Sequence, residues 1–212
     1  MQLKLTGKKI LLLCERLDIA QFLHVYLKFL HKQGHTLPDY QIINLDGLER
    51  MPAVRQKLLA QSSWAQVEKV ILFADATHRI RSKMLEVYRA IDSLFALDKV
   101  QRDYYLFPGK RPTGRWEKGF LECLLLDNLC PKSAENLHPN IMRFVVEDFL
   151  FTVNANRGRD YKLANHSRHS LCAYLSGTEK FAGLRLAEAA FYGAFLLHAS
   201  AFEGLKLFLL DL

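Results

Sequence analysis

Two apolar segments that each end on an acidic residue constrain the fold of this chain most. One is Leu11–Cys14 followed by Glu15, and the other is Val70–Ala74 followed by Asp75. Such runs are typical of strands that are buried on both faces of a parallel sheet. A helix-period pattern follows each run, and ligands of such sheets bind beyond the carboxyl ends of the strands. We therefore expect Glu15 and Asp75 to share one edge of one sheet.

Strand-like and helix-like patterns alternate over the first half of the chain. The predicted strands lie near residues 9–14, 41–45, 67–74 and 104–107. Apolar residues at three- and four-residue spacing predict helices near residues 19–30, 51–59 and 80–94, and Gly34 is expected to end the first of them. The alternation predicts an α/β fold with a mainly parallel sheet of four or five strands and helices on both sides.

The remainder of the chain has helical patterns. Apolar spacing predicts a helix within residues 120–129, which Pro131 stops, and a final helix over residues 200–212. No repeat and no linker rich in Gly or Ser interrupts the chain. We predict an α/β domain over residues 1–130 and a C-terminal helical extension over residues 131–212 that packs on it as one structural unit.

The composition favours some partners over others. A formal charge of +7 favours phosphate-bearing partners such as DNA or RNA. The alternative is a basic protein that has this net charge and binds no such partner. No apolar stretch reaches eighteen residues, so we expect no membrane partner, and the start reads as a strand and not as a signal peptide. The four cysteines form no C-x-x-C pair, which argues against a zinc ribbon and fits a reducing cytoplasm.

Acidic residues at one sheet edge favour a divalent cation. Hard cations such as Mg²⁺ and Mn²⁺ prefer oxygen ligands, and Mg²⁺ often uses only one or two carboxylates. The candidate ligands near the predicted strand ends are Glu15, Asp18, Asp75 and Glu122.

Several motifs resemble those of a known family. Leu12–Asp18 looks like the first Toprim motif, a strand ending in Glu that is usually followed by Gly, with Asp shortly after; Phe73–Thr77 looks like the second, a strand ending in Asp-x-Asp. Tyr105–Pro108 with Gly119–Glu122, and the tail segments 184–190 and 201–206, resemble bacterial Toprim-like proteins of uncharacterised function that are related to the nuclease part of the overcoming-lysogenisation-defect proteins. The likeness covers nearly the whole chain, and its specificity comes from the order of the motifs.

The resemblance implies a Toprim-like fold and a nuclease, or a related phosphotransfer enzyme, that depends on Mg²⁺ or Mn²⁺ and acts on nucleic acid. It implies that Glu15 and Asp75 are catalytic, with Glu15 in acid–base chemistry, and that Asp18, Asp75 and Glu122 contact the metal. The metal would neutralise the developing phosphoryl charge and lower the pKa of a bound water.

Two residues depart from the Toprim pattern. Arg16 stands in place of the usual Gly, and Thr77 stands where the second Asp would be. Both changes oppose metal binding, because one adds a cation beside Glu15 and the other removes a carboxylate. A catalytically lapsed module that binds nucleic acid or a protein partner is therefore the alternative to an enzyme. Arg16 should distinguish the two functions: turned outward it leaves room for a cation, and folded over Glu15 it would occupy the metal position.

A basic loop follows the fourth predicted strand. Gly109 and Gly114 have the spacing of a phosphate-binding P-loop, but the required Lys-Ser/Thr is absent, which excludes that motif. Cations contact phosphates and an aromatic ring can stack on a base, so the loop is a candidate edge for single-stranded nucleic acid. The alternative is a surface loop with its Trp packed on the core. The predicted nucleic-acid contacts are Lys110, Arg111, Arg115, Trp116 and Lys118.

Overall fold

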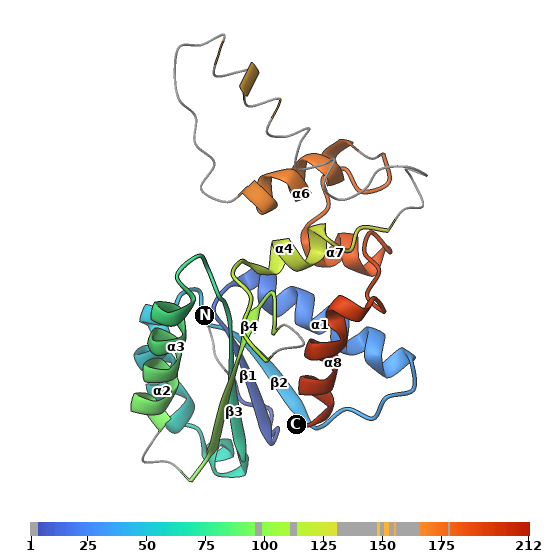
Figure 1. The fold of residues 1–212 in the computed structure, drawn as a ribbon. Coiled ribbons are helices and arrows are strands. Elements are labelled where there is room, and N and C mark those ends of the chain that lie inside the picture. The colour runs from blue at the N-terminus through green and yellow to red at the C-terminus, as the bar shows by residue number, and fades with distance from the viewer. Residues whose placement is uncertain are drawn as a thin grey trace. The chain divides into compact units, whose positions relative to one another are not determined.

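A computed structural model describes residues 4–95, 99–110, 114–130, 148, 151–152, 155, 166–177 and 179–212 (Figure 1). The chain divides into two compact units. One unit comprises Met1–Gly119 together with Glu203–Leu212, and the other comprises Phe120–Phe202. This division differs from the predicted domains 1–130 and 131–212 on two points. The first unit ends eleven residues earlier than the predicted domain, and the last helix belongs to the unit that contains the sheet.

Within the described residues, the first unit contains one four-stranded sheet in which all strands are parallel. The strands are β1 (Ile10–Cys14), β2 (Tyr40–Asn44), β3 (Lys69–Asp75) and β4 (Gln101–Phe107). Their spatial order is β2-β1-β3-β4, so the two central strands are the ones that precede Glu15 and end on Asp75. The predicted α/β class with a mainly parallel sheet is confirmed at this level.

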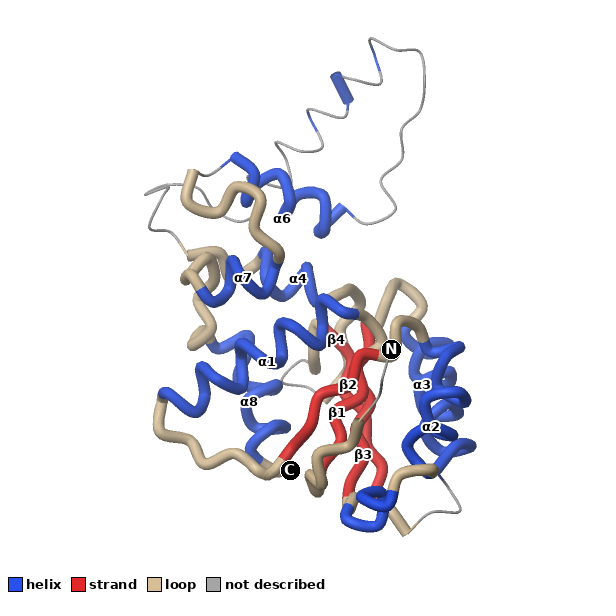
Figure 2. The backbone as a smooth tube through the Cα atoms, turned by 180° about the vertical axis from the view of Figure 1, so that it is seen from behind, coloured by secondary structure: helices blue, strands red, loops and turns tan. Residues whose placement is uncertain are grey.

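Helices cover both faces of this sheet. Figure 2 shows α2 (Met51–Leu59) and α3 (Ile80–Phe95) on one face, and α1 (Leu17–Lys32) and α8 (Glu203–Leu210) on the other. Two short 3-10 helices, η1 (Leu48–Arg50) and η2 (Ser62–Gln66), flank α2. Gly34 follows α1 with φ +85°, and its amide donates to the carbonyl of His31 at 3.0 Å. The predicted end of the first helix is therefore confirmed, because glycine adopts this left-handed conformation without strain.

The two faces of the sheet bury different side chains. On the α2–α3 face, aliphatic residues such as Leu13 and Leu72 join one core cluster with Val87 of α3. On the other face, Phe107 contacts Phe22 of α1, with ring centroids 6.3 Å apart. Phe73 and Tyr105 contact Phe208 of α8 on this face, at 5.9 and 5.2 Å. Because both faces are covered, successive residues of β1 and β3 are apolar.

The second unit is helical in its described part. It contains α4 (Leu121–Leu126), α6 (His166–Gly177), α7 (Leu186–Phe191) and η4 (Ser200–Phe202). The Sγ of Cys123 lies 3.1 Å from the Oγ of Ser167, which joins α4 to α6. The prediction that a helical extension packs on the α/β domain stays a prediction for this unit. Among the helices that the structure describes, none has the length and apolar character needed to cross a membrane.

Candidate functional site

The ends of β1 and β3 bring Glu15 and Asp75 together. The amide of Glu15 donates to the carbonyl of Phe73 at 2.9 Å, which continues the pairing of the two strands by one residue. The Oε2 atom of Glu15 then accepts a hydrogen bond from the amide of Asp75 at 3.2 Å. The prediction that both acidic residues lie at one edge of one sheet is therefore confirmed.

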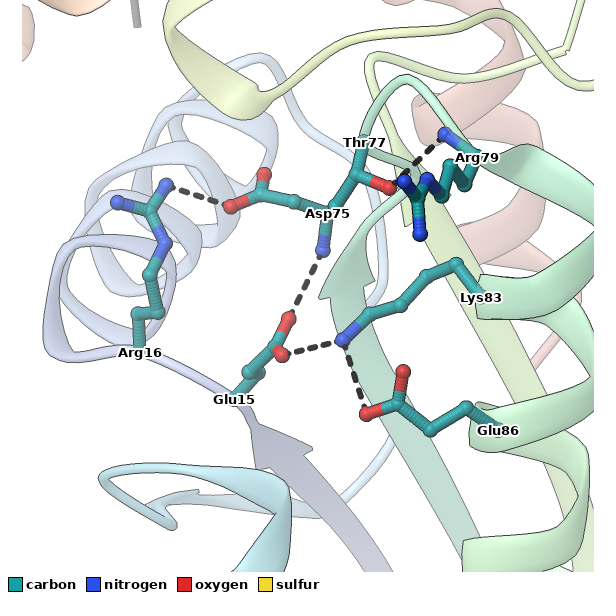
Figure 3. A network of polar contacts seen from close by, with 7 residues as sticks. All are labelled: Glu15, Arg16, Asp75, Thr77, Arg79, Lys83 and Glu86. Carbon is teal, nitrogen blue, oxygen red and sulfur yellow. Dashed lines mark hydrogen bonds and ion pairs between the residues drawn. The ribbon is translucent and has the colours of Figure 1, made fainter. Parts of the chain in front are cut away.

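A lysine of α3 neutralises Glu15. The Nζ of Lys83 lies 2.5 Å from the Oε1 of Glu15 and 3.4 Å from the Oε1 of Glu86 (Figure 3). The side chain of Lys83 is only 9% exposed, and that of Glu15 is 17% exposed. Charges so far removed from water require partners of opposite charge, and each of these two residues supplies the partner of the other.

Arg16 contacts Asp75 and not Glu15. One guanidinium nitrogen of Arg16 lies 2.7 Å from the Oδ2 of Asp75, and the other lies 3.6 Å from the Oδ2 of Asp18. The side chain of Asp75 is 5% exposed, so this ion pair is shielded from water. Arg16 adopts neither of the two predicted positions, because its side chain points into the acidic group and pairs with the carboxylate of Asp75 on the neighbouring strand.

The donor set at this edge does not fit a metal ion in the observed arrangement. Glu15 and Asp75 each accept a cationic side chain where a metal would bind. Within the part of the chain that the structure describes, no three His, Cys, Asp or Glu residues form a group that could hold a metal. Glu122 belongs to the second unit, where it is fully buried in the first turn of α4. The predicted catalytic and metal-binding roles of Glu15, Asp18, Asp75 and Glu122 stay predictions.

Thr77 occupies a tight turn after β3. Its φ is +58°, and its Oγ1 accepts a hydrogen bond from the amide of Arg79 at 3.3 Å. Two backbone hydrogen bonds, of 2.7 and 3.1 Å, join Thr77 to Gly119. A β-branched residue rarely adopts this left-handed conformation. Thr77 stands at the position of the second Asp of the resembled motif. Its backbone hydrogen bonds to Gly119 therefore fix the conformation of the chain at this position.

The basic loop folds back on itself after β4. Lys110 and Trp116 form an isolated antiparallel bridge, and the Nζ of Lys110 lies 4.7 Å from the centre of the Trp116 ring. Trp116 also stacks on Tyr104 at 6.0 Å and meets Tyr105 edge-on at 5.4 Å. Trp116 thus packs on the core, as the alternative prediction for this loop had it. Arg111 lies outside the described residues, and contact of the loop with nucleic acid stays a prediction.

A pocket of about 1280 Å³ lies between this loop and the start of α3. Its walls combine four cationic side chains, two aromatic rings and two aliphatic side chains, together with Gly114 and Glu117. Burial, together with the charge of Asp103, raises the pKa of Tyr104, whose ring borders the pocket. The cationic lining is Arg81, Lys110, Arg115 and Lys118, and the apolar lining is Ile80, Met84, Tyr104 and Trp116.

Sequence reasoning missed Lys83 and Arg81. Lys83 is one of few buried charged residues among those described, and it lies three residues after Ile80 and four before Val87. These spacings place Lys83 on the apolar stripe of α3, where a buried cation requires an acidic partner. A lysine within this apolar stripe was therefore the feature of the sequence that could have indicated a buried ion pair. Arg81 gave no comparable signal, because it is one of several cations near the start of α3.

Comparisons with known proteins identify no relative of this chain. No protein-family model, no curated protein and no solved structure matches it. The resemblance to Toprim proteins is therefore carried by the short motifs alone, and function has to be inferred from the geometry of the two sites.

Proposed function

We propose that this protein is a catalytically lapsed Toprim-like module that binds single-stranded nucleic acid in the basic pocket. The observation that carries the proposal is the lining of that pocket, in which Arg81, Lys110, Arg115 and Lys118 border the rings of Tyr104 and Trp116. Proteins that bind single strands combine cations that track the phosphates with aromatic and apolar surfaces that contact the bases.

The size of the pocket favours a polymer over a small molecule. Pockets for small ligands typically measure about 300–1,000 Å³ and bury most of the ligand. The present pocket, at about 1280 Å³, is larger, and its cations come from two segments of the chain, α3 and the loop after β4. An extended strand of nucleotides would contact both segments at once. The formal charge of +7 supports the same class of partner.

The strand-end acids support a binding role over a catalytic one. Metal-dependent phosphodiester cleavage needs carboxylates that are available to a divalent cation. Glu15 and Asp75 instead contact Lys83 and Arg16 at 2.5 and 2.7 Å. A nuclease that depends on Mg²⁺ or Mn²⁺ is the competing function, and it predicts different results in the experiment below.

The test measures the binding of a fluorescent single-stranded DNA or RNA oligonucleotide by anisotropy at low salt. We expect the double variant Lys110→Glu/Arg115→Glu to lose at least about tenfold in affinity, because it places two acids where phosphates would bind. The double variant Lys28→Glu/Lys57→Glu, at exposed positions of α1 and α2 that do not line the pocket, makes the same change in net charge and should have little effect. Equal losses in both variants, or no binding by the unmodified protein, would remove the pocket from the function.

A second arm of the same experiment tests catalysis. The unmodified protein is incubated with the oligonucleotide and with Mg²⁺ or Mn²⁺, and the products are separated on a denaturing gel. We expect intact oligonucleotide. Cleavage that disappears in Glu15→Gln would establish the nuclease and contradict the lapsed site, whereas cleavage that persists unchanged in that variant would exclude Glu15 from the mechanism.

A further inference from the structure

We infer that a second cavity, between α8 and the loop after β4, is a binding site for one guanine nucleotide. This cavity, the α8 cavity, measures about 440 Å³, which lies within the range of small-ligand sites. The inference goes beyond the proposed function, because single strands can bind in the basic pocket without it. All lining residues belong to the unit that contains the sheet. They are Tyr105, Lys110, Trp116, Gly204, Leu207, Phe208 and Asp211.

One face of α8 forms a wall of the α8 cavity. Four lining residues follow one another at the i, i+3, i+4 and i+7 spacing of a helix face: Gly204, Leu207, Phe208 and Asp211. The amide of Asp211 donates to the carbonyl of Leu207 at 3.1 Å, which extends this face to the end of the helix. Leu207 is 59% exposed, whereas Leu205 and Leu209 of the same helix are fully buried. The wall therefore presents apolar surface that the core does not use and that a ligand would cover.

Aromatic rings of the α8 cavity supply surface on which a planar base can stack. The ring of Tyr105 contacts those of Trp116 and Phe208, with centroids 5.4 and 5.2 Å apart. The three rings come from β4, from the loop after it and from α8, so separate segments bring them to one cavity. Every base has a face that stacks on such rings. The rings thus favour a nucleobase without selecting one.

Gly204 keeps the α8 cavity open at the helix backbone. Its φ lies outside the left-handed region, so its conformation does not require glycine. A Cβ atom at this position would meet the hydroxyl of Tyr105 at 3.9 Å, an ordinary contact, so packing does not require glycine either. Glycine disfavours a helix relative to alanine. Close approach of a ligand to the backbone of α8 accounts for a glycine at this position.

Two charged residues of the lining select the ligand. The Nζ of Lys110, 4.7 Å from the centre of the Trp116 ring, places a cation beside the stacking surface, where a phosphate would pair with it. The carboxylate of Asp211 only accepts hydrogen bonds. Guanine alone among the bases has two adjacent donors, N1–H and N2–H, which match the two oxygens of a carboxylate. Uracil and thymine present one donor between two carbonyl oxygens, which a carboxylate repels.

Calorimetric titration with guanosine 5′-monophosphate tests the inference, with uridine 5′-monophosphate as the comparison. We expect a dissociation constant on the order of 0.1 mM for the guanine nucleotide, within the efficiency limit of small ligands. The uracil nucleotide should bind at least about tenfold more weakly, and Asp211→Asn should remove most of this preference. Equal binding of the two nucleotides, or binding of neither, would overturn the inference. Binding of free tryptophan without guanosine monophosphate would assign the cavity to an amino acid and would overturn it as well.

Gly204→Met fills the α8 cavity from the helix and should weaken the binding of guanosine monophosphate at least about tenfold. Its Tm should not fall, because methionine favours a helix more than glycine does. Gly177→Met is the matched control, at an exposed glycine of α6 where a Cβ atom would meet nothing within 4 Å, and it should leave the affinity unchanged. Unchanged affinity in Gly204→Met would contradict the inference. Asp211→Asn, at an exposed residue, covers the case in which Gly204→Met folds poorly.

The guanine nucleotide can be free or part of a strand, since Lys110 and Trp116 line both the α8 cavity and the basic pocket. Anisotropy with an all-thymine oligonucleotide, and with one that carries a single guanine, distinguishes the two sources. Tighter binding of the guanine-containing strand that Gly204→Met removes would assign the site to a strand, and equal binding of both strands would assign it to a free nucleotide. The calorimetric titrations use no oligonucleotide, so failure of the proposed function would not affect them.

Discussion

The Nζ of Lys83 lies 2.5 Å from the Oε1 of Glu15, although the two residues are separated by 68 positions in the chain. This contact joins the amino-terminal half of α3 to the carboxyl end of the central strand β1. It neutralises the acidic residue for which the Toprim resemblance implies acid–base chemistry. We therefore expect the pair to affect the stability of the sheet unit.

The first prediction concerns the energy of this pair. Lys83→Met should lower the free energy of unfolding by about 3 kcal/mol, because it leaves the carboxylate of Glu15 buried without its cation. Glu15→Gln combined with Lys83→Met should cost less than the two single changes added together. Urea unfolding of the four proteins measures this coupling.

Glu86→Gln is the control: its side chain is 55% exposed, and we expect a change of no more than about 0.5 kcal/mol. Simple additivity of the two single changes would contradict the prediction.

The second prediction concerns Thr77. Thr77→Asn should stabilise the protein by about 1 kcal/mol, since Asn tolerates the left-handed conformation at φ +58° and can still accept the hydrogen bond from Arg79. For a chain of this length we expect Tm to rise by about 2–4 °C. Thr77→Val keeps the branched Cβ and loses the acceptor, so it should lower Tm. A higher Tm for Val than for Asn would show that the backbone of Thr77 is not strained.

The third prediction tests whether α8 belongs to the sheet unit. Leu209 is fully buried, and Leu209→Ala should cost about 2–5 kcal/mol of unfolding free energy. Leu207, two residues earlier on the same helix, is 59% exposed, and Leu207→Ala should change stability by no more than about 0.5 kcal/mol. Chemical denaturation gives both values. Similar effects of the two substitutions would indicate that α8 does not pack through the face that contains Leu209.

The fourth prediction concerns the dependence of nucleic-acid binding on salt. If the four cations of the pocket each contact a phosphate, the logarithm of the binding constant for a single strand should fall with the logarithm of salt concentration at a slope of about −3. Lys118→Gln should make this slope less steep by about 0.7. Anisotropy titrations over a series of NaCl concentrations measure the slope. A slope near zero would exclude phosphate contacts by the pocket.

The fifth prediction concerns alkaline pH. Burial raises the pKa of Cys14 above its ordinary value of 9.0, and burial raises the pKa of Tyr26 and Tyr105 above the ordinary value of 10.0. Above those ordinary values the unfolded chain loses protons that the folded protein retains. Stability is therefore fully present below about pH 9 and is lost as the pH rises, with a slope of up to about 1.4 kcal/mol per pH unit for each group.

Urea midpoints between pH 7 and pH 10.5 test the fifth prediction. Cys14→Ala should remove the part of the loss that begins near pH 9, while Cys172→Ala, at an exposed cysteine, should leave the pH profile unchanged. Identical profiles for the unmodified protein and Cys14→Ala would show that the thiol of Cys14 does not contribute.

Local pattern determined most of the sheet unit. The apolar runs that form β1 and β3 are recognisable because both faces of these central strands are buried, and the first three helices follow the apolar spacing of their buried faces. The edge strand β4 is different: it begins at Gln101, three residues before the predicted start. Its first residues are polar, and Gln101 and Arg102 are exposed, so they carry no apolar signal, and only pairing with β3 makes them a strand.

The sequence by itself determined which acids reach the carboxyl edge of the sheet, because Glu15 and Asp75 follow strands whose apolar pattern is local. Only the tertiary structure decided what those acids contact. Lys83 and Arg16 reach them through the placement of α3 and the turn before α1, and the return of α8 to the sheet depends likewise on contacts of Phe208 with Phe73 and Tyr105. Residue spacing reports which face of an element is apolar, whereas the partner of a buried charge is set by packing between segments that are distant in the chain.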